Sequence, residues 1–145
     1  MTGCASSTLP HEMSSTQAPI FDRLEQLQKI EGALLEGEEI YAVYDMKGGG
    51  TGFIGITSRR VIVYDKAYLS TKQALVSIPY SRIVTVAAEE EPVLLTGGRG
   101  FLSSSALVLN LHGEKHYHFD FRGADKARHA HDLILWKVLQ AEGRE

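Results

Sequence analysis

Seven short runs of apolar and β-branched residues follow one another between residues 38 and 122, and they limit the fold more than any other feature of the chain. Glycine, proline, asparagine and serine separate the runs, as they separate strands that are joined by turns. Strands this short and this closely spaced predict a small, strongly bent antiparallel sheet or barrel, so the expected fold class is mostly β. We expect the strands at 38–45, 53–57, 60–65, 74–78, 82–90, 104–111 and 114–122.

A helix is expected after the last strand, from Ala124 to about Ala141. Apolar side chains recur there at three- and four-residue spacing, which is typical of one helix face. Leu133 lies beside this face and Trp136 lies roughly opposite to it. We expect the helix to cover one open end of the sheet, with Leu133 and Trp136 off the core face. The predicted core face consists of Ala127, Ala130, His131, Ile134, Val138 and Ala141.

A second helix is expected before the first strand, over residues 19–35. Pro19 suits the first helical turn, where its missing N–H is not needed, and Gly37 is a typical stop signal after the last turn. The helix is amphipathic, so it either packs on its own domain or docks on another chain. Its apolar face consists of Ile20, Leu24, Leu27, Ile30 and Leu34.

The N-terminal segment and the charge balance argue against several classes of protein. Residues 1–18 are rich in Ser and Thr without apolar periodicity, so we expect a flexible tail. Cys4 is the only cysteine and cannot form an internal disulfide, which favours a reducing compartment such as the cytoplasm. The formal charge of −3 shows no basic excess for nucleic acid or an anionic membrane. No apolar run approaches the roughly 18 residues of a membrane span.

Three stretches of the β region carry a resemblance to a known family. They are Leu35–Ile40 with its Gly-Glu pair, Gly52–Ile62 with a Thr-x-x-Arg hairpin, and Ser77–Ile83 with the letters IPY. With seven strands and a C-terminal helix, they resemble the bacterial pleckstrin-homology-like (PH-like) domains. The resemblance covers about residues 38–141 and implies a PH-like sheet or barrel capped by the C-terminal helix. It also implies an interaction role, in some members as homo-oligomers. We expect neither catalysis nor a cofactor.

The last predicted strand offers a candidate metal site. His116, His118 and Asp120 alternate along it and therefore share one face. Two imidazoles and a carboxylate on one face can bind a divalent transition metal. The alternative is that these side chains form the polar outer face of an amphipathic strand.

Two basic residues in glycine-rich connections are candidates for binding an anion. Lys47 lies in the connection 46–52, and Arg99 lies in the connection 91–100. Phosphoinositide-binding PH domains place several basic residues on the first two strands and the loop between them. In this chain, Lys47 is the only basic residue on the first two predicted strands and the loop between them, before Arg59. We therefore do not expect binding to membrane lipid.

The chemistry-bearing residues do not predict an enzyme, because no nucleophile with its base and no pair of carboxylates is linked by spacing. We expect a non-enzymatic module that binds a protein or associates with itself through apolar side chains. The alternatives are a binder of a small ligand or anion at the open end of the barrel, and a metal-binding protein. The candidate interface residues are Ile20, Leu24, Leu27, Ile30, Leu133 and Trp136.

Overall fold

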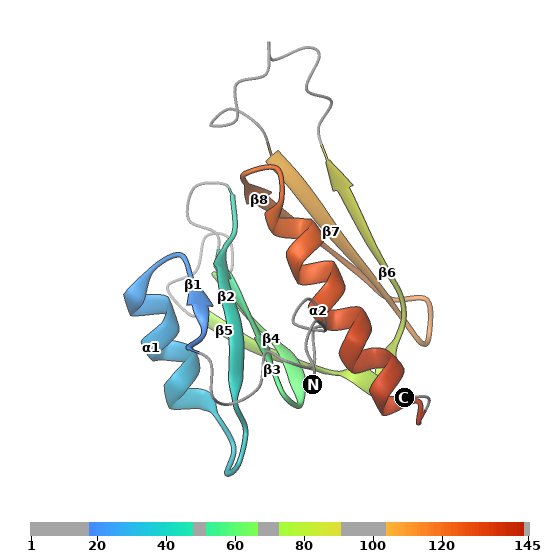
Figure 1. Ribbon diagram of the computed structural model, residues 1–145, viewed down its shortest axis with the longest axis horizontal. Coiled ribbons are helices and arrows are strands. Elements are labelled where there is room, and N and C mark those ends of the chain that lie inside the picture. The colour runs from blue at the N-terminus through green and yellow to red at the C-terminus, as the bar shows by residue number, and fades with distance from the viewer. Residues whose placement is uncertain (1–17, 48–51, 67–72, 91–103, 144–145) are drawn as a thin grey trace, which may run out of the picture.

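The strands of this protein form two sheets that are bent sharply against each other (Figure 1). The computed structural model describes residues 18–47, 52–66, 73–90 and 104–143. The predicted tail 1–18, with Cys4, lies outside the described residues except for its last position. The elements are β1 (Ile20–Phe21), α1 (Leu24–Ala33), β2 (Ile40–Asp45), β3 (Phe53–Thr57), β4 (Arg60–Lys66), β5 (Gln73–Pro79), the 3-10 helix η3 (Tyr80–Arg82), β6 (Ile83–Glu90), β7 (Ser104–Leu111), β8 (His116–Arg122) and α2 (Lys126–Ala141).

One sheet has five strands in the order β1-β2-β3-β4-β5, and the other has three in the order β6-β7-β8. β1 runs parallel to β2, and the other neighbouring strands are antiparallel. The chain passes from one sheet to the other at η3. On the opposite side, Met46 and Phe121 form a bridge, and the Lys47 N–H donates to the Asp120 carbonyl oxygen at 2.6 Å. The sheets therefore approach a barrel without closing into one.

The predicted fold class is confirmed, since the seven predicted strands are β2 to β8, with ends that differ by at most two residues. β1 is an additional strand that the sequence analysis did not predict. Gly52 directly precedes the second predicted strand in a place where only glycine fits, because a Cβ there would lie 1.5 Å from the Tyr64 carbonyl oxygen.

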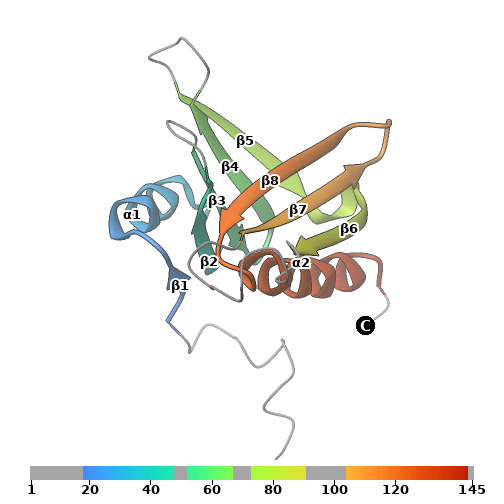
Figure 2. The ribbon, with the colours of Figure 1, turned by 90° about the horizontal axis from the view of Figure 1, so that it is seen from above.

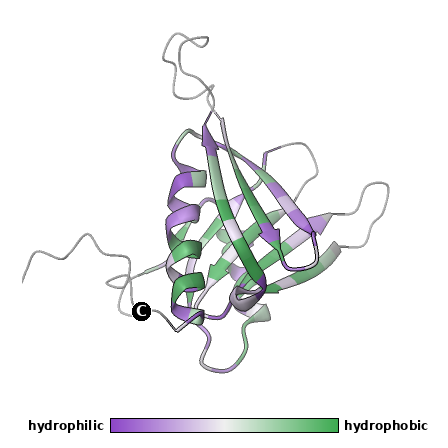
Figure 3. Ribbon diagram, turned by 90° about the vertical axis from the view of Figure 1, so that its right-hand side faces the viewer, coloured by the Kyte–Doolittle hydropathy of each residue, from purple (hydrophilic) through white to green (hydrophobic). Residues whose placement is uncertain are grey.

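α2 lies along the three-stranded sheet and reaches η3, so it covers the interior between the two sheets (Figure 2). Hydrophobic and hydrophilic positions alternate along this helix and the strands beside it (Figure 3). The predicted core face was partly wrong. Leu133 is buried, whereas His131 is partly exposed and Ala141 is exposed. The helix is thus rotated toward Leu133, whose side chain buries more apolar area than an alanine does. The buried residues of α2 are Ala127, Ala130, Leu133, Ile134 and Val138.

The N-terminal helix is shorter than predicted, because α1 begins at Leu24 and ends at Ala33. Ile20 and Phe21 pair with β2 instead of continuing the helix, which gives their backbone groups hydrogen-bond partners along the sheet. α1 packs on the face of the five-stranded sheet opposite to α2, where it forms a separate apolar cluster. Ile30 sits directly over Gly55, where a Cβ would lie 2.8 Å from its Cδ1 atom. The cluster consists of Leu27, Ile30, Val43, Phe53 and Ile62.

Candidate functional site

A buried ion pair holds the turn between β3 and β4 against the end of α1. The Glu38 side chain is fully buried, and Arg60 donates to both of its carboxylate oxygens, from Nε at 2.9 Å and from Nη2 at 3.0 Å. Arg60 also donates from Nη2 to the carbonyl oxygen of Ala33, the last residue of α1, at 2.8 Å. The guanidinium therefore connects the sheet, the loop before β2 and the C-terminal end of the helix.

Two further donors complete the environment of Glu38. The Leu35 N–H donates to Oε1 at 2.8 Å, and the Thr57 hydroxyl donates to Oε2 at 2.5 Å. Burial by itself raises the pKa of a carboxyl group, but hydrogen bonds from Arg60, Leu35 and Thr57 and the Arg60 charge outweigh it. The pKa of Glu38 is lowered to about 2. Glu38 is therefore ionised at neutral pH despite its burial.

Tyr80 completes this network from the corner between the sheets. Its hydroxyl donates to the carbonyl oxygen of Thr57 at 2.6 Å and lies 3.2 Å from that of Arg60. Burial raises the pKa of Tyr80 well above its usual value. Glu38, Thr57, Arg60 and Tyr80 all belong to the three stretches that carried the family resemblance. Sequence reasoning noted them as motif letters but did not predict that they form one network.

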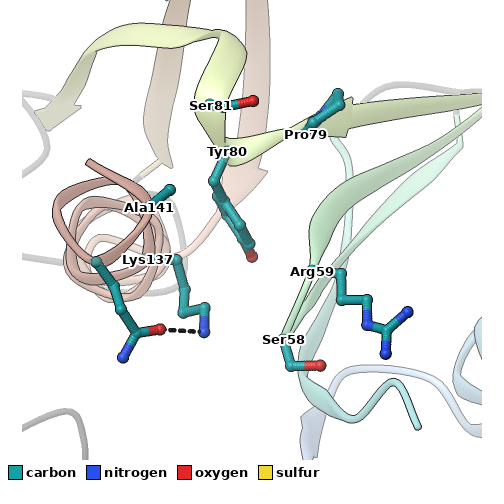
Figure 4. Close-up of a pocket in the computed structure, with 8 residues that line it drawn as sticks. Ser58, Arg59, Pro79, Tyr80, Ser81, Lys137 and Ala141 are labelled. Carbon is teal, nitrogen blue, oxygen red and sulfur yellow. Dashed lines mark hydrogen bonds between the residues drawn. The ribbon is translucent and has the colours of Figure 1, made fainter. Parts of the chain in front are cut away.

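Directly beside this network, a pocket of about 290 Å³ opens between the β3–β4 turn, η3 and the last turns of α2 (Figure 4). Its polar lining is Ser58, Arg59, Tyr80, Ser81, Lys137 and Gln140, and Pro79 and Ala141 add apolar surface. Tyr80 lies between the helix on one side and the Ser58–Arg59 turn on the other (Figure 4). Sequence reasoning missed this pocket, because α2 and the turn lie far apart in the chain.

Two cationic side chains line the pocket. The Lys137 ammonium donates to Gln140 Oε1 at 2.5 Å and lies 5.2 Å from the centre of the Trp136 ring. Burial lowers the pKa of Lys137, and the nearby charge of Glu39 opposes this effect. Arg59 is exposed, and its guanidinium points away from Lys137 (Figure 4). Its Nη2 atom lies next to Gly37.

A second pocket, of about 250 Å³, lies where the two sheets approach each other near Met46. It contains three of the predicted ligand-binding residues, Lys47, His118 and Asp120, together with Asp65. Its two carboxylates oppose the binding of an anion beside Lys47. The other predicted anion-binding residue, Arg99, lies outside the described residues.

The predicted metal ligands share the exposed face of β8, and Phe119 and Phe121 point to the core. His118 Nε2 lies 3.1 Å from Asp120 Oδ1, but His116 is not among the residues of the neighbouring pocket. Within the described part of the chain, no three His, Cys, Asp or Glu side chains come together in a group that could hold a metal ion. The arrangement therefore matches the polar outer face that we gave as the alternative.

The six predicted interface residues do not form one surface. Leu27 and Ile30 are buried under α1, and Leu133 is buried under α2, so these three contribute to the core. Trp136 is partly buried against Tyr41, with ring centres 5.6 Å apart. Ile20 and Leu24 are exposed, and Phe21 lies between them in the chain.

The exposed apolar residues at the start of the described chain form what we call the N-terminal patch: Ile20, Phe21 and Leu24. Their exposed fractions are 43%, 42% and 57%. They lie on β1 and the first turn of α1, at the edge of the five-stranded sheet. Sequence reasoning identified two of the three, although it placed them on a continuous helix.

Comparisons with known proteins agree with this architecture. A family model described as "Bacterial PH domain" matches residues 34–135. A crystal structure of a pleckstrin homology domain from Shewanella amazonensis SB2B superimposes with a TM-score of 0.57 and 22% sequence identity, and it covers 81% of this chain and 99% of that chain. An uncharacterized protein of Bacillus subtilis (strain 168), YozO, is 33% identical over 63 residues, which is 43% of this chain and 53% of the relative. The similarity thus spans about half the length of that relative.

Among the residues that the structure describes, neither α1 nor α2 combines the length with the apolar character that crossing a bilayer requires.

Proposed function

The chain belongs to the bacterial PH domain family, and we propose that it acts as a non-enzymatic binding module whose partner is a second copy of itself. The observation that carries this proposal is the N-terminal patch, formed by Ile20, Phe21 and Leu24. Three large apolar side chains that fall within five consecutive residues and remain about half exposed are a typical feature of a protein interface.

The location of the patch supports self-association. β1 is an edge strand of its sheet, so its outer side has no neighbouring strand among the described residues. Two identical sheet edges can meet around a two-fold axis, because each then presents the same groups to the other. The cytoplasmic location predicted from the single cysteine is compatible with such an assembly and belongs to the same proposal.

Charges beside the patch support the same arrangement. Arg23 and Glu25 are exposed, and they form an ion pair of 3.3 Å within one chain. Around a two-fold axis, Arg23 of one copy can approach Glu25 of the other. The patch is therefore complementary to itself in charge as well as in apolar character.

Removing α1 is a poor test of this proposal. Leu27 and Ile30 are buried against the sheet, and Arg60 is bonded to the end of the helix. A truncated chain would expose that core, so a change in its assembly would not report on the patch.

A single charged substitution at the most exposed position of the patch is a sharper test. Leu24→Asp places a carboxylate in the first turn of α1, where the helix dipole tolerates negative charge. The matched control is Leu75→Asp on β5, which changes an apolar side chain of similar exposure elsewhere. The assay is light scattering after size-exclusion chromatography, over a series of concentrations of the full chain.

We expect the unmodified chain and Leu75→Asp to form the same dimer. Leu24→Asp should weaken the association by about tenfold or more, because it places a charge in the interface. A monomer at every concentration, or equal assembly of both variants, contradicts the proposal. Circular dichroism of each variant confirms that the fold is retained.

A further inference from the structure

We infer that the pocket between the β3–β4 turn, η3 and the end of α2 binds the carboxylate of an organic acid, with Lys137 as its main cationic contact. This site is separate from the N-terminal patch and does not depend on self-association. Its ligand is a carboxylate carried by an apolar group, either a free acid or the C-terminal residue of a peptide.

Lys137 has no ion-pair partner within the part of the chain that the structure describes. No carboxylate there lies within ion-pair distance of its ammonium group, and its hydrogen bond goes to the neutral amide of Gln140. The rings of Tyr41 and Trp136, with centres at 5.9 Å and 5.2 Å, shield it further from water. A partly desolvated cation of this kind gains more from a bound anion than an exposed lysine does.

Two serine side chains line the walls of the pocket, with their hydroxyl groups directed away from Lys137 (Figure 4). Ser58 Oγ accepts the Glu39 N–H at 3.0 Å, which leaves its own hydrogen available to donate. Ser81 is exposed on the opposite wall, at the start of the corner between the sheets. The pocket walls therefore carry neutral donors in addition to the Lys137 cation.

The charge balance favours a carboxylate over a phosphate. Lys137 and Arg59 are positive, and Glu39 is close enough to Lys137 to act on its titration. These three charges sum to about one positive unit, which matches a monoanion. The negative end of the α2 dipole lies at the same place and opposes any anion, a dianion about twice as strongly as a monoanion.

The walls of the pocket indicate what the carboxylate is attached to. Pro79, Ala141 and the ring of Tyr80 provide apolar surface beside the polar groups. A branched aliphatic chain can contact these walls while its carboxylate reaches Lys137. Arg59 contributes its positive charge at longer range, because its guanidinium points away from Lys137 (Figure 4) and lies next to Gly37.

The test is an amide NMR titration of the full ¹⁵N-labelled chain with acetate, isovalerate and inorganic phosphate. A fourth titration uses the peptide acetyl-Gly-Gly-Val, with its amidated form as the uncharged comparison. We expect saturable shifts at Ser58, Ser81 and Lys137, with isovalerate binding several-fold tighter than acetate because of its added apolar contact. Tighter binding of the peptide than of isovalerate identifies a chain terminus as the source, and weaker binding identifies a free acid.

Three variants connect the binding to the proposed contacts. Lys137→Gln should raise the Kd for isovalerate by about tenfold, because it removes the charge-assisted contact. Glu39→Gln should lower the Kd by about two- to fivefold, because it removes the opposing negative charge. Lys115→Gln is the matched control, since the Lys115 ammonium also lies 5.9 Å from the centre of a tyrosine ring, that of Tyr117.

Shifts that do not saturate would overturn the inference. So would equal effects of Lys137→Gln and Lys115→Gln, or tighter binding of phosphate than of isovalerate. None of these outcomes depends on the oligomeric state, so this site and the N-terminal patch are tested independently.

Discussion

Replacing Glu38 by Gln tests the network that positions the β3–β4 turn. The change keeps the size of the side chain and removes its charge, which leaves the Arg60 guanidinium without its ionic partner. The Glu38 side chain is fully buried and receives hydrogen bonds from Leu35, Thr57 and Arg60. Breaking a buried pair by removing one partner typically costs several kcal/mol.

The lowered pKa of Glu38 gives the magnitude of the stability that its charge contributes. It falls from 4.5 to about 2 on folding, and each unit corresponds to about 1.4 kcal/mol, so ionised Glu38 contributes about 3 kcal/mol. Because the folded pKa is the lower one, this stabilisation is fully present above pH 4.5 and is lost as the pH falls toward 2. The unfolded chain binds the proton first in this window, so stability decreases with acid.

The assay is urea unfolding of the unmodified chain and of Glu38→Gln between pH 7 and pH 2.5. We expect the difference in the free energy of unfolding to be about 3 kcal/mol at pH 7 and about half of that near pH 3. All other carboxyl groups are the same in both proteins, so their contributions to the free energy of unfolding cancel in the difference. The control is Glu36→Gln, an exposed glutamate close by in the chain, which should change stability by less than about 0.5 kcal/mol.

A difference that stays constant from pH 7 to pH 2.5 would refute the reasoning, because it would mean that the charge of Glu38 is not what stabilises the fold. A difference below about 1 kcal/mol at pH 7 would refute it as well, since it would place the ion pair among exposed pairs of little net value.

Two further predictions follow from the packing of the helices. Gly55→Ala should lower the free energy of unfolding by about 1–3 kcal/mol, because the added Cβ would lie 2.8 Å from Ile30. Gly32→Ala, which adds a Cβ in open space on α1, should raise the free energy of unfolding by up to about 1 kcal/mol. Urea unfolding measures both variants, and equal effects would contradict the packing of Ile30 on Gly55. Burial lowers the pKa of His129, whose Nδ1 contacts the Tyr44 hydroxyl, so NMR titration of its ring should give a midpoint below 6.5. Because the unfolded chain binds this proton first, protein stability should fall as the pH drops from 6.5 to that midpoint. A midpoint at or above 6.5 would show that His129 is not desolvated in this way.

The strands could be predicted from the sequence because their signal is local. Along β8, Tyr117, Phe119 and Phe121 alternate with polar residues, and the latter two are buried as the alternation requires. The N-terminal segment shows the limit of such signals. Ile20 and Phe21 fit a helical pattern as well as a strand, and only β2, about twenty residues later, supplies the partner that decides between them.

The core face of α2 shows a second limit. Neighbouring helical positions are separated by about 100°, so Leu133 and Ile134 both border the same arc. Periodicity alone predicted that Leu133 lies off the core face, whereas in the structure its side chain is buried against the sheets. The pocket beside Tyr80 was beyond prediction for the same reason, since Lys137 and Ser58 come together only through the fold.

The family motif and the candidate pocket lie at the same corner of the fold, but the motif residues determine the fold and the pocket residues determine what can bind. Glu38, Thr57, Arg60 and Tyr80 bond to one another or to nearby backbone groups, so their polar atoms are occupied by the protein itself. Such residues determine where the β3–β4 turn lies, and resemblance through them indicates fold and not ligand. Positions between or directly after them, such as Ser58, Arg59 and Ser81, line the pocket without being part of that network. Binding specificity at this corner should therefore follow from these three residues and from Lys137, while the motif residues hold the turn that carries them rigidly in place.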